Sequence, residues 1–152
     1  MGWVNRTRNH PPHNWGGSPV LEMQITHIDH VTLIVTDVAK ARAFYGGILG
    51  FKEIAPPAVF DFVAIWYDLG GQYLHLLLKP VPDSISARHV CFHVDDIAAA
   101  REHFRKHGIG MDETVTIPGC ERFFIRDPDE NRIEILNWHK TYDPNRDGRF
   151  ST

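Results

Sequence analysis

Residues 30–42 read HVTLIVTDVAKAR, and residues 89–101 read HVCFHVDDIAAAR. When the two stretches are aligned at an offset of 59 residues, 7 of the 13 positions are identical. The same offset places Asp68 on Asp127 further along the chain, with no net shift between the two stretches. Similarity that stays in register over such a length indicates a duplicated structural unit.

The duplication defines the organisation of the chain. We place a first module at residues 25–82 and a second at residues 87–139, together forming one domain. Residues 1–24 show neither helical nor strand periodicity and lack the apolar segment of a secretory signal, so we expect a flexible extension there. Residues 140–152 are expected to form a C-terminal tail.

Each module repeats one order of elements. A β-rich run is followed by an aspartate, Asp37 or Asp96, that suits the N-cap of a helix. The next stretch has helical spacing and ends at Gly50 or Gly108, as is typical of a left-handed C-cap. Three further strand-like runs are expected near residues 51–55, 60–69 and 72–79 in the first module and near 113–117, 121–127 and 132–138 in the second. The sequence therefore predicts an α+β fold of two tandem βαβββ units forming a half-open curved sheet, a cup that can bind a small molecule.

Composition excludes several classes of protein. The 152 residues carry a net charge of −3 without a run of Lys or Arg, so nucleic acid is not an expected partner. No apolar run reaches the roughly 18 residues that span a bilayer, so no membrane partner is expected. Cys91 and Cys120 are interpreted as two reduced core thiols, and a cytoplasmic location is expected.

Four side chains that can bind a metal occupy matching positions of the repeat. His30 and His89 begin the first strand of each module, and His75 and Glu134 lie in the last. A strand histidine is usually an ordinary core or half-exposed residue, and Glu134 between two isoleucines also fits a solvent-facing position. The symmetry of the four positions supports the alternative of a single divalent ion, Zn, Ni, Co, Mn or Fe, held by imidazole and carboxylate, and the residues alone leave both interpretations open.

Several other side chains are candidates for the walls of a small-molecule pocket. Arg122 could bind an anionic group of the substrate, although a solvated surface arginine is the ordinary interpretation. Strand aromatics usually pack in the core, so each aromatic candidate has that alternative. The remaining candidates are His93, Phe62, Trp66, Tyr73, Phe92 and Phe124.

The motifs IDHVTLIVTDVAKARAFYGGILGF (28–51), YLHLL (73–77), RHVCFHVDDI (88–97) and FFIRDPDENRIEIL (123–136) resemble the vicinal oxygen chelate superfamily. That superfamily includes glyoxalase I, fosfomycin-resistance transferases, methylmalonyl-CoA epimerase, extradiol dioxygenases and bleomycin-resistance proteins. The resemblance covers about residues 25–139. It implies that the metal ligands are His30, His75, His89 and Glu134.

The resemblance also implies an activity. The leading hypothesis is a metal-dependent lyase or isomerase of glyoxalase type, in which the metal chelates two neighbouring oxygens of a small molecule and Glu134 moves a proton. The alternatives are an Fe(II) dioxygenase of extradiol type and a protein that binds or modifies an antibiotic. A homodimer is expected, with His30 and His75 of one chain facing His89 and Glu134 of the other.

One position departs from the pattern of the superfamily. Residue 130 is Glu where glycine is usual in the DPDEN turn. Because glycine adopts a positive φ at little cost, we expect the turn to place its positive φ elsewhere, at Asn131.

Overall fold

The computed structural model describes residues 23–149, so the predicted extension lies outside the described part of the chain except for its last two residues. The first module contains β1 (His30–Val35), α1 (Val38–Ala41), η1 (Arg42–Ile48), β2 (Lys52–Ile54), β3 (Ala64–Asp68) and β4 (Tyr73–Leu78). The second contains β5 (Val90–His93), α2 (Ile97–Lys106), β6 (Asp112–Glu113), β7 (Cys120–Arg126) and β8 (Arg132–Trp138). The short helix α3 (Pro144–Asp147) follows in the predicted tail. The βαβββ order is confirmed in both modules.

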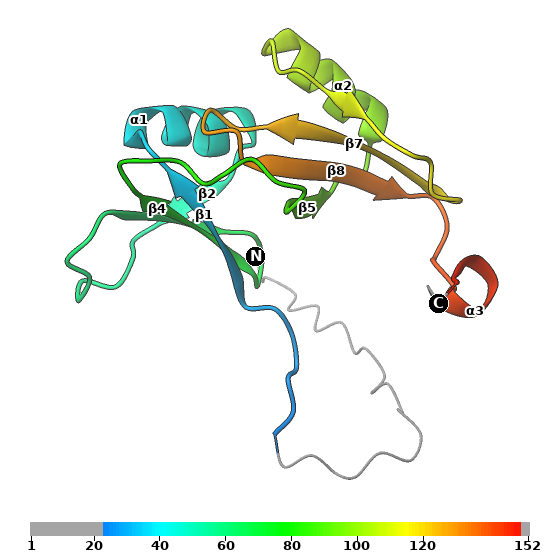
Figure 1. Cartoon of the computed structure of the whole chain (residues 1–152), viewed down its shortest axis with the longest axis horizontal. Coiled ribbons are helices and arrows are strands. Elements are labelled where there is room, and N and C mark those ends of the chain that lie inside the picture. The colour runs from blue at the N-terminus through cyan, green and yellow to red at the C-terminus, as the bar shows by residue number, and fades with distance from the viewer. Residues whose placement is uncertain (1–22, 150–152) are drawn as a thin grey trace, which may run out of the picture.

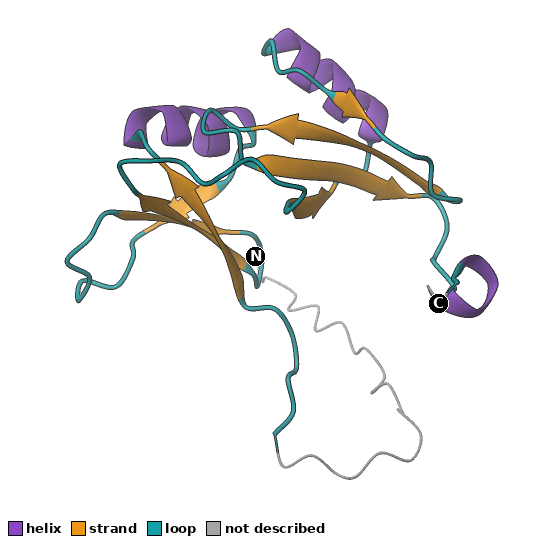
Figure 2. Ribbon diagram, in the orientation of Figure 1, coloured by secondary structure: helices purple, strands orange, loops and turns teal. Residues whose placement is uncertain are grey.

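The two modules form two open four-stranded sheets with the same topology. Their strand orders are β1-β4-β3-β2 and β5-β8-β7-β6, and the first and last strands of each module pair in parallel. Figure 1 shows α1 and α2 on the same side of the two sheets, and Figure 2 shows the opposite faces of the strands free of helices. The α+β cup predicted from the repeat is therefore confirmed. No helix among residues 23–149 has the length and apolar character needed to cross a membrane.

One hydrophobic core joins the two modules. It contains strand residues from both sheets, such as Leu76 and Ile133, together with Phe44 of η1 and Phe104 of α2. Because strand side chains alternate between faces, the residues between these core positions point to the open side. His75 and Glu134 are such residues, and this alternation positions both candidate ligands outside the core.

The predicted helix boundaries are confirmed. The Asp37 carboxylate accepts hydrogen bonds from the backbone N–H groups of Ala39 and Lys40, at 2.8 and 3.0 Å, and Asp96 accepts one from Ala99 at 2.8 Å. Gly50 and Gly108 have φ of 72° and 68°, as left-handed C-caps require.

The expected single helix of the first module is wrong in one respect. After the four residues of α1 the chain continues as the π-helix η1. Gly46 and Gly47 lie within η1, and two adjacent glycines weaken the preference for α-helical geometry.

Two expected strands are also shorter in the structure. Residues 60–63 precede β3 in a loop, and β6 has only two residues instead of five.

In the structure, the alignment of Asp68 with Asp127 is displaced by one residue. Leu69 N–H donates to Gln72 in the first β-hairpin, whereas Asp127 N–H donates to Asn131 in the second, so the second turn is one residue longer.

The extra residue explains why the expectation for the DPDEN turn is wrong. Glu130 itself has a positive φ of 65°, and Asn131 does not. The Asp127 carboxylate accepts hydrogen bonds from the backbone N–H groups of Asp129 (2.9 Å) and Asn131 (2.8 Å), which fixes the turn around Glu130. The Asn131 side chain is then free to donate to the carbonyl of Ile34 in β1, at 2.7 Å.

The DPDEN turn is also the polar connection between the modules. Tyr45 of η1 donates its hydroxyl to Asp127 at 2.7 Å, with both residues buried. Thr36 N–H donates to Asp129 at 3.1 Å. Burial raises the pKa of Asp127, against the effect of the hydrogen bonds that it accepts. The turn therefore depends on several donors acting on one buried carboxyl group.

Tyr45→Phe should lower the free energy of unfolding by about 1–3 kcal/mol, because it removes one donor from a buried carboxylate without changing the shape of the ring. Urea denaturation followed by circular dichroism measures this difference. Tyr142→Phe, at an exposed tyrosine, is the control and should change little. Equal stability of Tyr45→Phe and wild type would contradict the role given to this hydrogen bond.

Glu130→Gly should raise the free energy of unfolding by roughly 0.5–1 kcal/mol, because glycine lacks the Cβ that makes a positive φ unfavourable. Glu130→Ala keeps Cβ and removes the carboxylate, so it separates the backbone effect from the loss of the side chain. The same denaturation experiment compares the two variants. A glycine variant no more stable than the alanine variant would refute the argument from backbone strain.

Candidate metal centre

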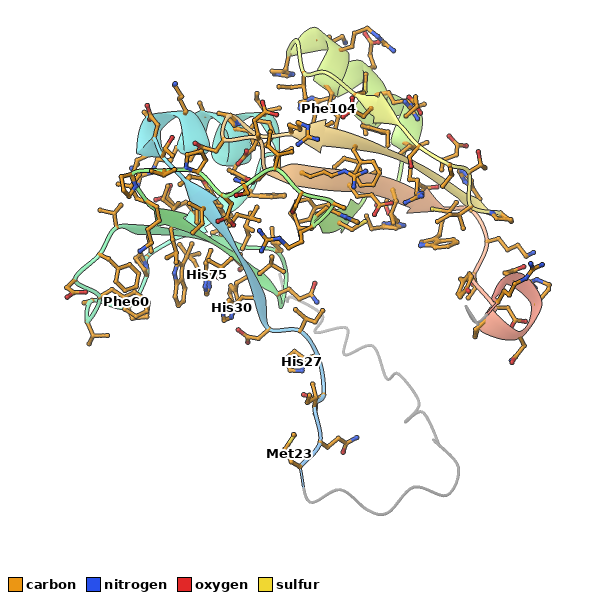
Figure 3. The ribbon with its side chains drawn as sticks, viewed as in Figure 1. Met23, His27, His30, Phe60, His75 and Phe104 are labelled. Atoms are coloured by element: carbon orange, nitrogen blue, oxygen red, sulfur yellow. The ribbon has the colours of Figure 1, made fainter. Side chains whose placement is uncertain are left out.

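The first half of the candidate centre is a pair of histidine rings on neighbouring strands. The rings of His30 (β1) and His75 (β4) are stacked, with centroids 4.2 Å apart. Trp66 of β3 lies opposite His75 in the sheet and stacks on its other face at 3.8 Å. Figure 3 shows His30 and His75 on the face of the first sheet that lies away from α1. The two imidazoles are therefore held side by side at the open face.

The Nε2 atoms of both rings are available as metal ligands. His75 is 8% exposed, and its buried Nε2 atom has no hydrogen-bond partner. Burial and the neighbouring His30 lower the pKa of His75, which favours the neutral, metal-binding form. The Nδ1 atom of His30 lies 2.9 Å from Asp29 Oδ1, an arrangement that leaves Nε2 as the coordinating atom.

The second half of the candidate centre is a histidine–carboxylate pair. His89 Nε2 lies 3.0 Å from Glu134 Oε2 of β8, and His89 Nδ1 lies 2.9 Å from the carbonyl of Ala87. Arg122 of β7 donates to the other carboxylate oxygen of Glu134 at 2.7 Å. The carboxylate is thus oriented by a guanidinium on one side and faces an imidazole on the other.

Arg122 also sets the ionisation of Glu134. Burial raises the pKa of Glu134, but the hydrogen bond and positive charge of Arg122 outweigh it, so the pKa lies below its ordinary value. Arg122 is almost buried, with a side chain 15% exposed, so the ordinary interpretation of a solvated surface arginine is wrong. The anionic group that it contacts in this chain is Glu134 itself.

Cys91 is a neighbour of Glu134 that the sequence reasoning missed. The expectation of a core thiol is correct for Cys120, which is buried, and wrong for Cys91, which is exposed. Cys91 lies two residues after His89 and opposite Glu134 in the sheet, so alternation along β5 was the signal that could have placed it. The residue as a whole is exposed, but its thiol is partly shielded from water, and this desolvation together with the nearby Glu134 charge raises the pKa of Cys91 to about 12.

Four other predicted site residues lie on the open faces of the two sheets. Tyr73 is near His75, with ring centroids 6.4 Å apart, and Trp66 is already described. Phe124 meets His89 edge to face at 5.1 Å. His93 shares the open face of β5 with His89 and is half exposed.

Two predicted pocket residues lie apart from the histidines. Phe92 points to the other face of β5, where it packs against the core and meets Phe51 at 5.1 Å. Phe62 lies in the loop before β3 and is 48% exposed.

The four candidate ligands are not assembled within one chain. Among residues 23–149, no group of three or more His, Cys, Asp or Glu side chains is arranged to hold a metal ion. The chain instead presents a His30–His75 pair and a His89–Glu134 pair. The donor atoms and the unpartnered Nε2 of His75 fit a divalent metal, and each pair by itself supplies two ligands.

A family model, the Glyoxalase/Bleomycin resistance protein/Dioxygenase superfamily, matches residues 27–135. The chain belongs to this superfamily. The match spans both modules and includes all four candidate ligands, so the resemblance noted in the motifs is confirmed. The members of the superfamily differ in activity, and membership alone does not select one.

The chain is also similar to individual proteins of known sequence or structure. YaeR of Escherichia coli K12 is 32% identical over 124 residues, covering 73% of this chain and 95% of that protein. Glyoxylase I 4 of Arabidopsis thaliana is 25% identical over 126 residues, covering 76% and 72%. The crystal structure of a glyoxalase family protein from Bacillus anthracis superposes with a TM-score of 0.71 at 29% identity, covering 78% of this chain and 99% of that one.

Arg122→Met should raise the pKa of Glu134, because the carboxylate stays buried while its guanidinium partner is lost. A carboxyl group whose folded pKa is depressed stabilises the fold above its unfolded pKa, and that contribution disappears as the pH falls through the folded pKa. In the variant Glu134 should therefore contribute less to stability at neutral pH, and the remaining contribution should disappear at a higher pH than in wild type. Carboxyl ¹³C NMR titration measures the pKa, and Arg126→Met on the same face of β7 is the control. An unchanged Glu134 pKa in Arg122→Met would disprove the assignment.

Proposed function

We propose that two copies of this chain form a metal-dependent enzyme of lyase or isomerase type, with two equivalent centres. In each centre His30 and His75 of one chain and His89 and Glu134 of the other hold one divalent ion. The substrate is a small molecule that offers two neighbouring oxygens. The expected cytoplasmic location stays a prediction.

The observation that carries this proposal is the buried, unpartnered Nε2 of His75. A buried polar atom without a hydrogen bond costs about 1–3 kcal/mol, and proteins rarely keep one without a use for it. On the neighbouring strand β1, His30 also has its Nδ1 engaged and its Nε2 free for a ligand. A metal that accepts both nitrogen lone pairs accounts for this arrangement, and the second chain supplies the remaining ligands that one chain does not assemble.

The residues of the proposed centre have separate tasks. When bound, the divalent ion supplies Lewis-acid stabilisation of a developing negative charge on a substrate oxygen. Arg122 holds Glu134 ionised and oriented. Glu134 can therefore accept a proton from the substrate carbon next to the chelated oxygens and return it to the neighbouring atom.

The pairing of Arg122 with Glu134 also favours a second candidate function. A carboxylate that stays ionised is a permanent ligand, and two histidines with one carboxylate are the ligand set of non-haem Fe(II) oxygenases. The second candidate is therefore an extradiol-type dioxygenase. Bound iron and oxygen uptake with catechols would identify it, whereas Zn, Ni, Co or Mn together with proton exchange in the substrate would identify the lyase or isomerase. A purified protein with no metal and no turnover would instead indicate a binding protein.

Mixing two inactive variants tests whether each centre is shared between chains. His75→Ala and His89→Ala should each bind little metal alone. After subunit exchange in a 1:1 mixture, about half of the dimers are mixed and each has one intact centre, so metal content should recover to about a quarter of wild type. Mass spectrometry of the metal in gel-filtered dimers measures the recovery.

A matched mixture of His75→Ala with His30→Ala is the control, because both substitutions damage the same half of the centre. No recovery is expected there. Equal recovery in the two mixtures, or a monomer in gel filtration, would contradict a shared centre. Full metal content in both single variants would refute the ligand assignment itself.

A further inference from the structure

A row of aromatic rings extends from the candidate ligand His75 to the surface. Beyond Trp66, which stacks on His75, the ring of Phe60 lies 5.9 Å from Trp66, and Phe62 stacks on Phe60 at 4.8 Å. Phe60 and Phe62 belong to the loop between β2 and β3. Figure 3 shows Phe60 on the same side of the first sheet as His75 and His30. The row therefore connects the rim of the cup with the candidate centre.

The outer end of this row is exposed. Phe60 and Phe62 are 39% and 48% exposed, and their loop neighbours Val59 and Val63 are 87% and 51% exposed. None of the four belongs to the hydrophobic core. Four apolar side chains on one short exposed loop form a patch of the kind that marks a binding site, because water contact with it is unfavourable.

The open face beside the row is apolar around Trp66, and the oppositely charged pair Lys52 and Asp68 lies further along β2 and β3 on the same face. The strand neighbour of Trp66 on β2 is Ile54, and the next pair along the sheet is Ala64 with Leu77. The corresponding face of the second sheet is different, since β7 and β8 place Arg122, Arg126 and Arg132 there. The first module is therefore the half of the cup that suits an uncharged, apolar group.

We propose that Phe60, Phe62 and Trp66 form a subsite for an aromatic ring that the substrate carries as a substituent beside its metal-chelating oxygens. This inference rests on the proposed function, because it takes His75 as the metal ligand from which the row begins. Ring pairs add a favourable contribution to the gain from apolar burial, so three aromatic side chains favour a ring over an aliphatic group. The inner end of the row is His75, whose imidazole is nine-tenths buried and whose Nε2 has no hydrogen-bond partner. Because the row leads to this atom, we take the occupant of the subsite to be a ligand of the metal centre rather than a second protein chain.

Two probes that differ only in the ring test the subsite. Phenylpyruvate and pyruvate both offer neighbouring oxygens, and only the first carries an aromatic substituent. Isothermal titration calorimetry of the protein with its own bound metal should show phenylpyruvate binding about tenfold more tightly. The double variant Phe60→Ala/Phe62→Ala should lose most of this advantage and keep its affinity for pyruvate. Tyr142→Ala, at another exposed aromatic residue, is the matched control and should behave as wild type.

Metal content and gel filtration of the same samples separate the possible outcomes. Equal affinity of wild type for the two probes, or an unchanged preference in the double variant, would overturn the subsite. A double variant that dissociates into monomers would also overturn it, because the loop would then belong to the subunit interface. Wild-type protein that holds no metal would refute the proposed function alone, since the ring preference can still be measured on that protein.

Discussion

The relative placement of the two modules depends on one buried carboxyl group. Asp127 accepts hydrogen bonds from the Tyr45 hydroxyl, from the side chain of Asn131 and from two backbone N–H groups of its own turn. This turn leads directly into β8, which carries Glu134, while Tyr45 and the contacts of Asn131 belong to the first module. Hydrophobic contacts in the shared core are non-directional, so this polar connection is what fixes the orientation of β8 against β1.

Strand alternation then determines which side chains line the open face of the cup. The core needs only every second residue of each strand, and the intervening positions can become polar without a cost in core packing. His75 and Glu134 occupy equivalent positions on the last strands of the two modules, and Thr32 and Cys91 occupy equivalent positions on the first. The duplicated fold thus places two similar pairs of candidate ligands at equivalent positions, with an imidazole in one module where the other has a carboxylate. Neither half is complete within one chain, which is why a second copy is part of the proposed function.

The sequence predicted the repeat, the helix caps and the pairing of candidate ligands because these follow from local spacing. It failed where distant contacts override local preference. The positive φ of Glu130 follows from the hydrogen bonds of Asp127, which no local pattern reveals. The contact of Arg122 with Glu134 depends on the register of β7 against β8, and that register is displaced by one residue from the repeat. The aromatic row could not be predicted because Phe60 and Phe62 lie in a loop that the strand pattern had assigned to β3.

The difference between His75 and Glu134 has a consequence for the charge of the proposed centre. Three neutral imidazoles and one carboxylate leave a divalent ion with one uncompensated positive charge, whereas a carboxylate at both positions would neutralise it. The guanidinium of Arg122 adds a further positive charge close to Glu134. Such a centre stabilises an anionic oxygen more strongly than a neutral one, as the enolate or alkoxide of a chelated substrate requires. In the proposed function the two halves would therefore have complementary tasks: the aromatic row would bind the apolar part of the substrate, and the metal centre would stabilise its charge.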